Sequence, residues 1–321
     1  MTPLDLVVLT GFLGSGKTTL LRDFLALPEA AGTAVIVNEA GEIGLDGAIL
    51  AEGAGGLQMA MLANGCVCCA AGSELSATIE NLLASVDVPP ARIVLETSGL
   101  SKPGPILRSL QSLAGLPLRI SVVATFDCLR GAEVAGFEEA AAQWAGAQAL
   151  VLTRRDLADP GAAAGVAAGI NPLAEIIDGA DRAAVLRAVF GRRRGAPVVV
   201  DEPSAQAHPR LVTWLARPAG ALAWDDVAVW LDNLAGLLGE RLLRVKGLVA
   251  VEGQDWPMLV QAVGTVFSAP RPFPPQPGPP FLVIIARDAA LAELAGMTPM
   301  LPIQVSAPSP FARARPVLRS A

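Results

Sequence analysis

The stretch Gly11-Phe12-Leu13-Gly14-Ser15-Gly16-Lys17-Thr18 decides the fold, because it fits the pattern G-x-x-x-x-G-K-[ST]. The apolar run 6–10 comes directly before it, and residues 18–26 have the pattern of a helix. Between a strand and a helix, glycines let backbone N–H groups turn inward around phosphate oxygens, and the helix N-terminus adds its positive end. The sequence therefore predicts a phosphate-binding P-loop and a bound nucleoside triphosphate.

Two side chains of this loop have predicted roles of their own. Lys17 reaches the β and γ phosphates and is a candidate catalytic residue, and the Thr18 hydroxyl binds Mg²⁺. The remaining groups of the loop complete the nucleotide site. These further candidates are Gly11, Gly14, Ser15, Gly16 and Thr19.

An acidic residue, Glu96, ends the apolar run 93–95. A P-loop fold places an acid there, near Mg²⁺ or its water shell, so Glu96 is a candidate for metal binding and for catalysis. The alternative is a solvated loop carboxylate. Gly99, three residues later, lets the backbone approach the γ-phosphate.

Apolar strands alternate with helical segments over the first half of the chain. This order predicts an α/β fold of the P-loop NTPase type with a doubly wound, mainly parallel sheet, whose ligands bind at the carboxyl ends of the strands. The expected strands are residues 6–10, 34–37, 92–95, 120–125 and 149–152, and the expected helices include 18–26 and 73–85.

The 321 residues suggest two domains at about 150 residues per domain. We expect a P-loop GTPase domain over residues 1–194 and a linker rich in proline and arginine over 195–220. A smaller α+β domain over 221–300 follows, with apolar segments 221–229, 243–251 and 280–286 alternating with helices that begin near 230, 256 and 288. A loosely ordered tail, 301–321, completes the prediction.

The amino-acid composition and the net charge exclude several classes of protein. Hydrophobic residues make up 52% of the chain and charged residues 17%, which favours a packed core over disorder. The apolar run 281–286 is far shorter than the roughly 20 residues of a membrane-spanning helix, and no signal peptide is recognisable. The net charge of −6 gives no attraction for nucleic acid or anionic lipid. We therefore expect a cytoplasmic protein with no membrane or nucleic-acid partner.

The segment Thr153-Arg154-Arg155-Asp156 follows a late strand, where P-loop GTPases carry the guanine-specific motif N-K-x-D. Thr153 can still bind backbone in place of asparagine, and the plane of Arg154 can stack on a base. Asp156 keeps the discriminating role, because a carboxylate accepts from guanine N1 and N2 and adenine has no matching donor pair. The sequence therefore predicts GTP rather than ATP.

Three thiols crowd into four positions in Gly65-Cys66-Val67-Cys68-Cys69. Thiolates favour Zn²⁺, Co²⁺ or Cu(I), and three protein ligands leave one position open for exchange. Buried thiols and a redox site are the alternatives. The single histidine, His208, excludes a site built from several histidines.

Two further acids lie where such folds carry a switch. The segment 38–46 follows the second strand, contains two glycines, and carries Glu42 and Asp46. These carboxylates are candidates to face Mg²⁺, the attacking water or a second metal, and so count as candidate catalytic residues.

Taken together, these residues resemble the CobW family of P-loop GTPases, which is related to the GTPases that deliver nickel to urease and hydrogenase. The resemblance covers most of the chain and is densest over 4–104. Its marks are T-G-F-L-G-S-G-K-T-T-L-L at 10–21, V-N-E-A-G-E-I-G-L-D-G at 37–47, G-C-V-C-C at 65–69 and E-T-S-G-L at 96–100. Weaker marks lie at 171–172 and 246–253.

The resemblance implies GTP hydrolysis coupled to metal insertion. It implies Cys66, Cys68 and Cys69 as metal ligands, a partner surface on the C-terminal domain, and, by analogy with the nickel GTPases, a nucleotide-dependent homodimer. Two features depart from the family pattern: Thr153–Asp156 replaces N-K-x-D, and no histidine-rich stretch is present.

The sequence thus predicts a GTP-dependent metallochaperone with Mg²⁺ and Zn²⁺ or Co²⁺, which delivers its metal to a client metalloenzyme or a cobalamin pathway. The alternatives are a metal-binding protein with degenerate nucleotide turnover, a P-loop small-molecule kinase, and a thiol redox protein.

Overall fold

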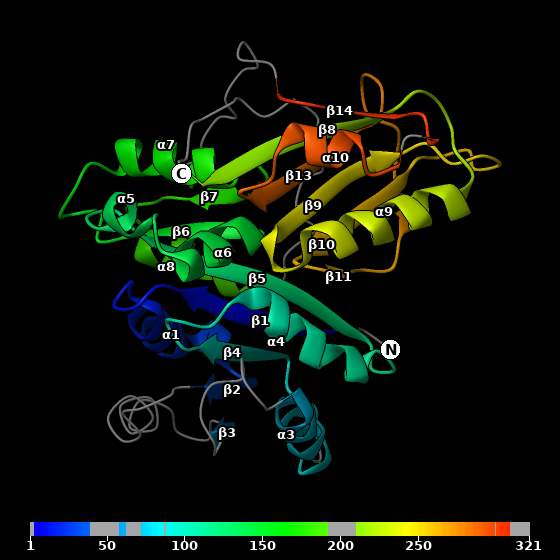
Figure 1. Cartoon of the computed structure of the whole chain (residues 1–321). Coiled ribbons are helices and arrows are strands. Elements are labelled where there is room, and N and C mark those ends of the chain that lie inside the picture. Colours follow the sequence, from blue (N-terminus) through cyan, green and yellow to red (C-terminus); the bar gives the residue numbers. More distant parts are fainter. Residues whose placement is uncertain are drawn as a thin grey trace. The chain divides into compact units, whose positions relative to one another are not determined.

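The computed structural model describes residues 3–38, 58–61, 72–86, 88–191, 210–298 and 300–308. The chain divides into two compact units. The first falls within residues 1–195 and the second within 196–316, apart from residues 168–173, which group with the second unit. Figure 1 shows the elements of both units.

The first unit is built on a sheet of seven strands in the order β3-β2-β4-β1-β5-β6-β7. Every neighbouring pair is parallel, so all carboxyl ends lie at one edge. The strands are β1 (Leu4–Gly11), β2 (Thr33–Asn38), β3 (Gln58–Met61), β4 (Arg92–Thr97), β5 (Leu118–Asp127), β6 (Ala149–Thr153) and β7 (Glu175–Ile177).

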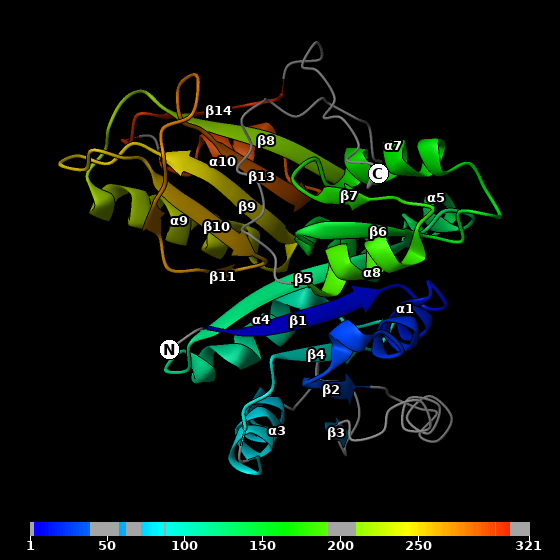
Figure 2. The same cartoon turned by 180° about the vertical axis from the view of Figure 1, so that it is seen from behind.

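Helices cover both faces of this sheet, as the two opposite views show (Figures 1 and 2). Val7 and Leu9 of β1 share a core with α1 and α8, whereas Phe126 of β5 points the other way and contacts Trp144 of α6. This alternation follows from the two-residue period of a strand. The helices are α1 (Lys17–Leu25), α3 (Gly72–Ala84), α4 (Pro103–Ser109), α5 (Gly131–Val134), α6 (Glu138–Gly146), α7 (Pro160–Ile170) and α8 (Arg182–Phe190).

The doubly wound parallel fold that the sequence predicts is confirmed, with its five expected strands and the helices near 18–26 and 73–85. Two strands, β3 and β7, were not expected. Both are short, three or four residues, and carry too little periodicity to separate them from loop.

The second unit is an antiparallel sheet with one long helix, α9 (Trp224–Leu238), packed on it. Trp230 and Leu234 of α9 share a buried core with Val245 and Ile284 of the sheet. The strand order is β11-β10-β9-β13-β8-β14, and β12 pairs with β10. The strands are β8 (Leu211–Pro218), β9 (Leu242–Val249), β10 (Met258–Val263), β11 (Val266–Phe267), β12 (Arg271–Pro272), β13 (Leu282–Arg287) and β14 (Ile303–Ser306), and a short helix is α10 (Leu291–Ala295).

Several boundaries predicted for this half are wrong. The expected linker 195–220 contains β8, which pairs with β13 and β14, and the expected tail 301–321 contains β14. The helix expected from 256 is strand β10, and the helix expected from 230 begins at Trp224. Arginine and proline at the ends of β8 give it the composition of a linker, although its middle pairs inside a sheet. Residues 195–209 and 309–321 lie outside the described residues.

Two cations lie buried on one strand of the second unit. Arg244 and Lys246 of β9 are 1% and 2% exposed. They are two positions apart, so they share a face of the sheet. Burial disfavours the charged form and lowers the pKa of the Arg244 guanidinium to about 10.

Within the described part of the chain, no helix combines the length and the hydrophobicity needed to cross a membrane.

Candidate nucleotide site

The phosphate loop adopts the conformation that its glycines permit. Gly14 and Gly16 have φ of 68° and 91°, a region that residues with a Cβ rarely enter, and Gly16 directly precedes α1. Gly11 lies so close to β5 that a Cβ would stand 2.0 Å from the Thr125 hydroxyl oxygen. The turn from β1 into α1 therefore depends on glycine at these positions.

Lys17 lies buried at the centre of this loop. Its Nζ donates to the carbonyl oxygen of Gly11 at 2.9 Å and to that of Phe12 at 3.4 Å. The side chain is 9% exposed and lines the pocket. The ammonium is thus already held inside the curve of the loop, where it can meet phosphate oxygens.

Thr18 and Glu96 meet at the end of β4. The Thr18 hydroxyl donates to Glu96 Oε1 at 2.6 Å, and the Glu96 side chain is buried. The register of β4 against β1 places Glu96 beside Leu9, just before the phosphate loop. A hydroxyl and a carboxylate oxygen are hard donors of the kind that Mg²⁺ takes beside phosphate oxygens and water. These two residues therefore fit the metal and would hold it.

The loop after β4 packs directly on the phosphate loop. Gly99 lines the pocket, and a Cβ on it would lie 2.6 Å from Leu13 Cδ2 and 2.8 Å from the Leu13 backbone. Gly99 thus approaches the backbone of the phosphate loop so closely that a larger residue has no room, and its predicted approach to the γ-phosphate stays a prediction.

Thr153 holds the base loop to the phosphate loop. Its hydroxyl donates to the Ser15 carbonyl oxygen at 2.9 Å and lies 3.3 Å from that of Phe126. A threonine hydroxyl is shorter than an asparagine amide, but β6 ends close enough for it to reach. Thr153 therefore makes the backbone contact that its position predicts.

Arg154 differs from the stacking role that the sequence suggests. With φ of 52°, it turns its guanidinium toward the phosphate loop, where Nη1 donates to Asp127 Oδ2 at 2.6 Å and Nη2 to the Gly14 carbonyl oxygen at 2.7 Å. The neighbouring Arg155 is ion-paired with Asp178. Both guanidinium groups are thus held by carboxylates, because Asp127 is the last residue of β5 and Asp178 directly follows β7.

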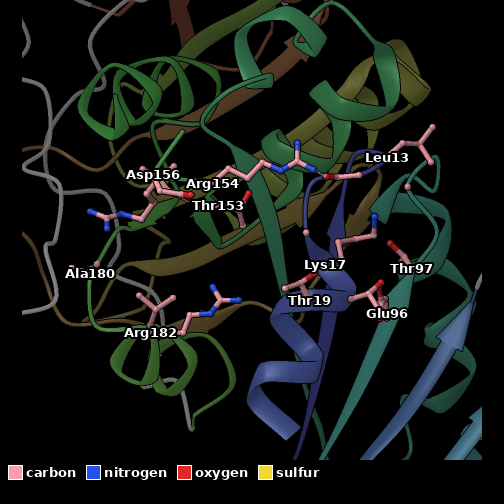
Figure 3. Close-up of a pocket in the computed structure, with 18 of the residues that line it drawn as sticks. Leu13, Lys17, Thr19, Glu96, Thr97, Thr153, Arg154, Asp156, Ala180 and Arg182 are labelled. Carbon is pink, nitrogen blue, oxygen red and sulfur yellow. Dashed lines mark hydrogen bonds between the residues drawn. The ribbon is translucent and has the colours of Figure 1, made fainter. Parts of the chain in front are cut away.

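These loops enclose one pocket of about 640 Å³ within the first unit. Lys17, Glu96 and Thr97 lie at one end, and Thr153, Asp156 and Arg182 at the other (Figure 3). The pocket thus joins a phosphate end to a base end, and it includes most of the predicted nucleotide residues. Those that line it are Gly14, Gly16, Lys17, Thr18, Thr19, Glu96, Gly99, Thr153, Arg154 and Asp156.

Sequence reasoning missed the residues that follow β5 and β7. Asp127 holds Arg154, Asp178 pairs with Arg155, and Gly179, Ala180 and Arg182 line the base end. A weak signal was available, because the segment 178–182 follows the apolar residues 176–177, and each strand of a parallel sheet ends at the ligand edge.

The predicted metal ligands Cys66, Cys68 and Cys69 and the switch acids Glu42 and Asp46 lie outside the described residues. Within the described ranges, no group of three or more histidine, cysteine or acidic side chains could hold a metal ion. Cys128 stands apart at the end of β5, half-buried. Burial, followed by the charges of Asp178 and Asp127, raises the pKa of its thiol to about 11.

Comparison with known families assigns both halves of the chain. The model of the CobW/HypB/UreG nucleotide-binding domain matches residues 5–178, and that of the cobalamin synthesis protein CobW C-terminal domain matches residues 211–296. The first match spans the parallel sheet with its pocket, and the second spans most of the antiparallel sheet.

Individual relatives agree with this assignment. The chain is 30% identical to the zinc chaperone YjiA of Escherichia coli over 84% of this chain and 89% of that one. It is also 30% identical to the zinc chaperone CobW of Pseudomonas aeruginosa over 83% and 82% of the two chains. The crystal structure of Zn(II)-bound YjiA GTPase from E. coli has the same fold, with a TM-score of 0.70 at 22% identity over 94% of this chain and 99% of that one. The chain therefore belongs to the CobW/HypB/UreG family of P-loop GTPases.

Proposed function

We propose that this protein is a GTP-hydrolysing metallochaperone, which binds Zn²⁺ or Co²⁺ as cargo and delivers it to a client metalloprotein. The observation that carries the proposal is the single pocket in which Lys17, the Thr18–Glu96 pair and the base loop meet. Family membership and the names of the relatives, which are zinc chaperones, support the metal half of the proposal.

Thiolates supply the cargo site in this proposal. Cys66, Cys68 and Cys69 offer three soft ligands, which suit Zn²⁺ or Co²⁺ and leave a fourth position for exchange with a client. Within the nucleotide site, Lys17 neutralises phosphate charge, and Glu96 with Thr18 would hold Mg²⁺, whose positive charge stabilises the leaving phosphate oxygens. Glu42 and Asp46 are the candidates to orient the attacking water.

Topology gives the two sites a route for coupling. Asn38, the last residue of β2, pairs with Thr97 beside the phosphate end, and Met61, the last residue of β3, pairs with Val37. The segments that carry the switch acids and the cysteines therefore start at the same edge of the sheet as the phosphate loop. Cys66 lies five residues after Met61 along the chain, a stretch that spans at most about 18 Å. A metal site within that reach can respond to the γ-phosphate.

Coupling requires that metal affinity differ between the nucleotide states. The test is an anaerobic competition titration of Zn²⁺ and Co²⁺ with the protein loaded with Mg²⁺ and either GDP or a non-hydrolysable GTP analogue. We expect binding at least about tenfold tighter in the GTP state, which corresponds to about 1.4 kcal/mol. Cys68→Ala should abolish this binding, and Cys128→Ala should leave it unchanged. Equal affinities in the two states would contradict the proposal.

Measured GTP turnover separates the remaining alternatives. Intact metal binding with no detectable hydrolysis would favour a metal-binding protein with degenerate turnover. Rapid phosphorylation of a metabolite without any metal dependence would favour a kinase.

A further inference from the structure

Gln143 is a buried amide on α6 whose end lies against the loop that follows β4. The side chain is 0% exposed, and its Nε2 donates to the carbonyl oxygens of Gly99 at 2.9 Å and Ser101 at 3.0 Å. Because both neighbours accept hydrogen bonds, the NH₂ end of the amide must face them. The other end, Oε1, has no hydrogen-bond partner among the described residues.

Folding stability alone gives this amide little advantage. The buried oxygen without a partner costs folding free energy, which offsets part of what the two donated hydrogen bonds contribute. The positions on either side of Gln143, Ala142 and Trp144, are apolar and buried. What glutamine alone supplies here is a pair of donors for the loop 97–101.

That loop forms part of the phosphate end of the pocket. It begins beside Glu96, and Gly99 contacts Leu13 of the phosphate loop so closely that no Cβ fits between them. Holding the carbonyl groups of Gly99 and Ser101 fixes the backbone on both sides of Leu100. The distance from this backbone to a γ-phosphate bound at Lys17 therefore depends on the amide of Gln143.

The first turn of α6 is held independently of this amide. Glu138 is ion-paired with Lys102, and the ring of Phe137, just before the helix, stacks on Phe12 at 5.1 Å between centroids. Trp144 Nε1 donates to the Thr125 carbonyl oxygen at 3.0 Å. A substitution at Gln143 thus releases the carbonyl groups of Gly99 and Ser101 without releasing the helix from the sheet.

We propose that Gln143 is a positioning residue for GTP hydrolysis, which holds the Gly99 loop against the γ-phosphate end of the pocket without touching the nucleotide. The inference rests on the GTPase part of the proposed function and is independent of metal delivery. A displacement of about 1 Å in such a loop is enough to lower a rate substantially.

Two variants of similar side-chain length separate positioning from stability. Gln143→Met removes the unpartnered oxygen but also both donors, which leaves the carbonyl oxygens of Gly99 and Ser101 without them, so its melting temperature should fall modestly, as in the control below. Gln143→Glu removes the donors and buries a carboxyl against two carbonyl oxygens, so it should melt lower. We expect kcat to fall about tenfold or more in both variants, with GDP affinity unchanged within about twofold.

A matched control tests whether the loss of any glutamine amide that binds the backbone gives the same result. Gln148 accepts a hydrogen bond from the Val122 N–H on β5 and does not line the pocket. Gln148→Met removes a backbone contact and should lower the melting temperature while leaving kcat unchanged. If kcat fell in proportion to the melting temperature in Gln143→Met, Gln143→Glu and Gln148→Met alike, Gln143 would have a structural role only.

A second readout does not need turnover. Affinity for a non-hydrolysable GTP analogue relative to GDP should fall about fivefold or more in Gln143→Met, because the loop meets only the triphosphate. Wild-type values of both kcat and this ratio in Gln143→Met would overturn the inference. If zinc affinity were the same in both nucleotide states, metal delivery would be contradicted, but the role of Gln143 in GTP hydrolysis would not be affected.

Discussion

At the scale of single residues, Arg154 connects three loops of the nucleotide site. Its guanidinium bonds to Asp127, which is almost fully buried, and to the Gly14 carbonyl oxygen in the phosphate loop. With the charge held there, only the aliphatic stem of Arg154 remains to cover a base. The discrimination between guanine and adenine that the sequence predicts then rests on Asp156 alone.

Removing Arg154 should weaken nucleotide binding. Arg154→Ala leaves the Asp127 carboxylate without its cation and frees Gly14, so we expect GDP affinity to fall about tenfold, since a hydrogen bond to a charged group contributes about 1.5–3 kcal/mol. Arg154→Lys should recover only part of the loss, because an ammonium lacks the fork that reaches both acceptors. Isothermal titration with GDP and Mg²⁺ measures both. Arg187→Ala, which breaks an exposed ion pair with Glu29, is the control and should bind normally.

Cys128 should be nearly inert toward alkylation. The thiolate is the reactive form, and the raised pKa, about 11 against an ordinary value of 9.0, makes that form roughly 100-fold rarer near pH 8. In a variant with Cys66, Cys68 and Cys69 changed to serine, iodoacetamide should label the folded protein roughly 100-fold more slowly than the same protein in urea. The labelling rate of the folded protein should rise about tenfold per pH unit up to about pH 11. Equal rates in the two states would show that burial does not protect the thiol.

The residues that sequence could predict are those whose place follows from local order. Lys17 and Thr18 begin a helix directly after a strand, and Glu96 ends a strand, so the parallel sheet alone brings them to one edge. Gln143 and Asp127 could not be found in this way. Their partners lie 44 and 27 positions away, and their roles depend on packing between elements that no local pattern reports.

At the scale of elements, α8 carries one wall of the base end. Its first residue, Arg182, lines the pocket and is ion-paired with Asp23 of α1. Asp181 caps the helix, with Oδ1 accepting from the backbone N–H of Ala183 at 2.9 Å and of Ala184 at 3.1 Å. This cap fixes where the helix begins, and therefore where Arg182 stands.

Loss of the cap should destabilise the first unit modestly. Asp181→Ala leaves two N–H groups at the start of α8 without their acceptor and should lower the free energy of unfolding by about 1 kcal/mol. Asp181→Asn keeps an acceptor oxygen at the same place and should restore most of it. The urea midpoint of both variants gives the comparison. A midpoint that falls equally in both would assign the effect to the lost charge instead of the cap.

Elements of the two units differ in how well the sequence predicts them. Buried parallel strands such as β4 and β6 are short apolar runs, which stand out against polar loops. In the antiparallel sheet, β8 ends in Arg217 and Pro218, and Gln261 interrupts the apolar residues of β10, so neither strand is one continuous apolar run. The strands that β8 and β10 pair with lie elsewhere in the chain. It is the hydrogen bonding to those partners, and not a local pattern, that makes these two segments strands.

At the scale of the whole molecule, each unit has a hydrophobic core of its own. Val7, Leu20 and Phe190 belong to the core of the first unit, and Trp230 and Val245 to that of the second. The nucleotide pocket is formed by the first unit alone. Ligand binding therefore stabilises one core directly.

Calorimetry should separate the two cores. We expect two unfolding transitions. GDP and Mg²⁺ should raise the melting temperature of the first unit, because ligand at 100 times Kd stabilises it by about 2.7 kcal/mol. The other transition should stay in place. Lys17→Ala, which removes the phosphate contact, should abolish the shift. A single transition that moves as a whole would mean that the units unfold as one cooperative body.

The burial of lysine leaves this protein with few reactive amines. Of its three lysines, Lys17 is 9% exposed and Lys246 is 2% exposed, while Lys102 is half-buried in its ion pair with Glu138. A protease that cuts only after lysine therefore meets two of its three side-chain targets buried in the folded protein. Among the lysine side chains, an acylating dye finds Lys102 first, beside the loop that Gln143 holds, so lysine labelling places a reporter next to the phosphate end of the pocket.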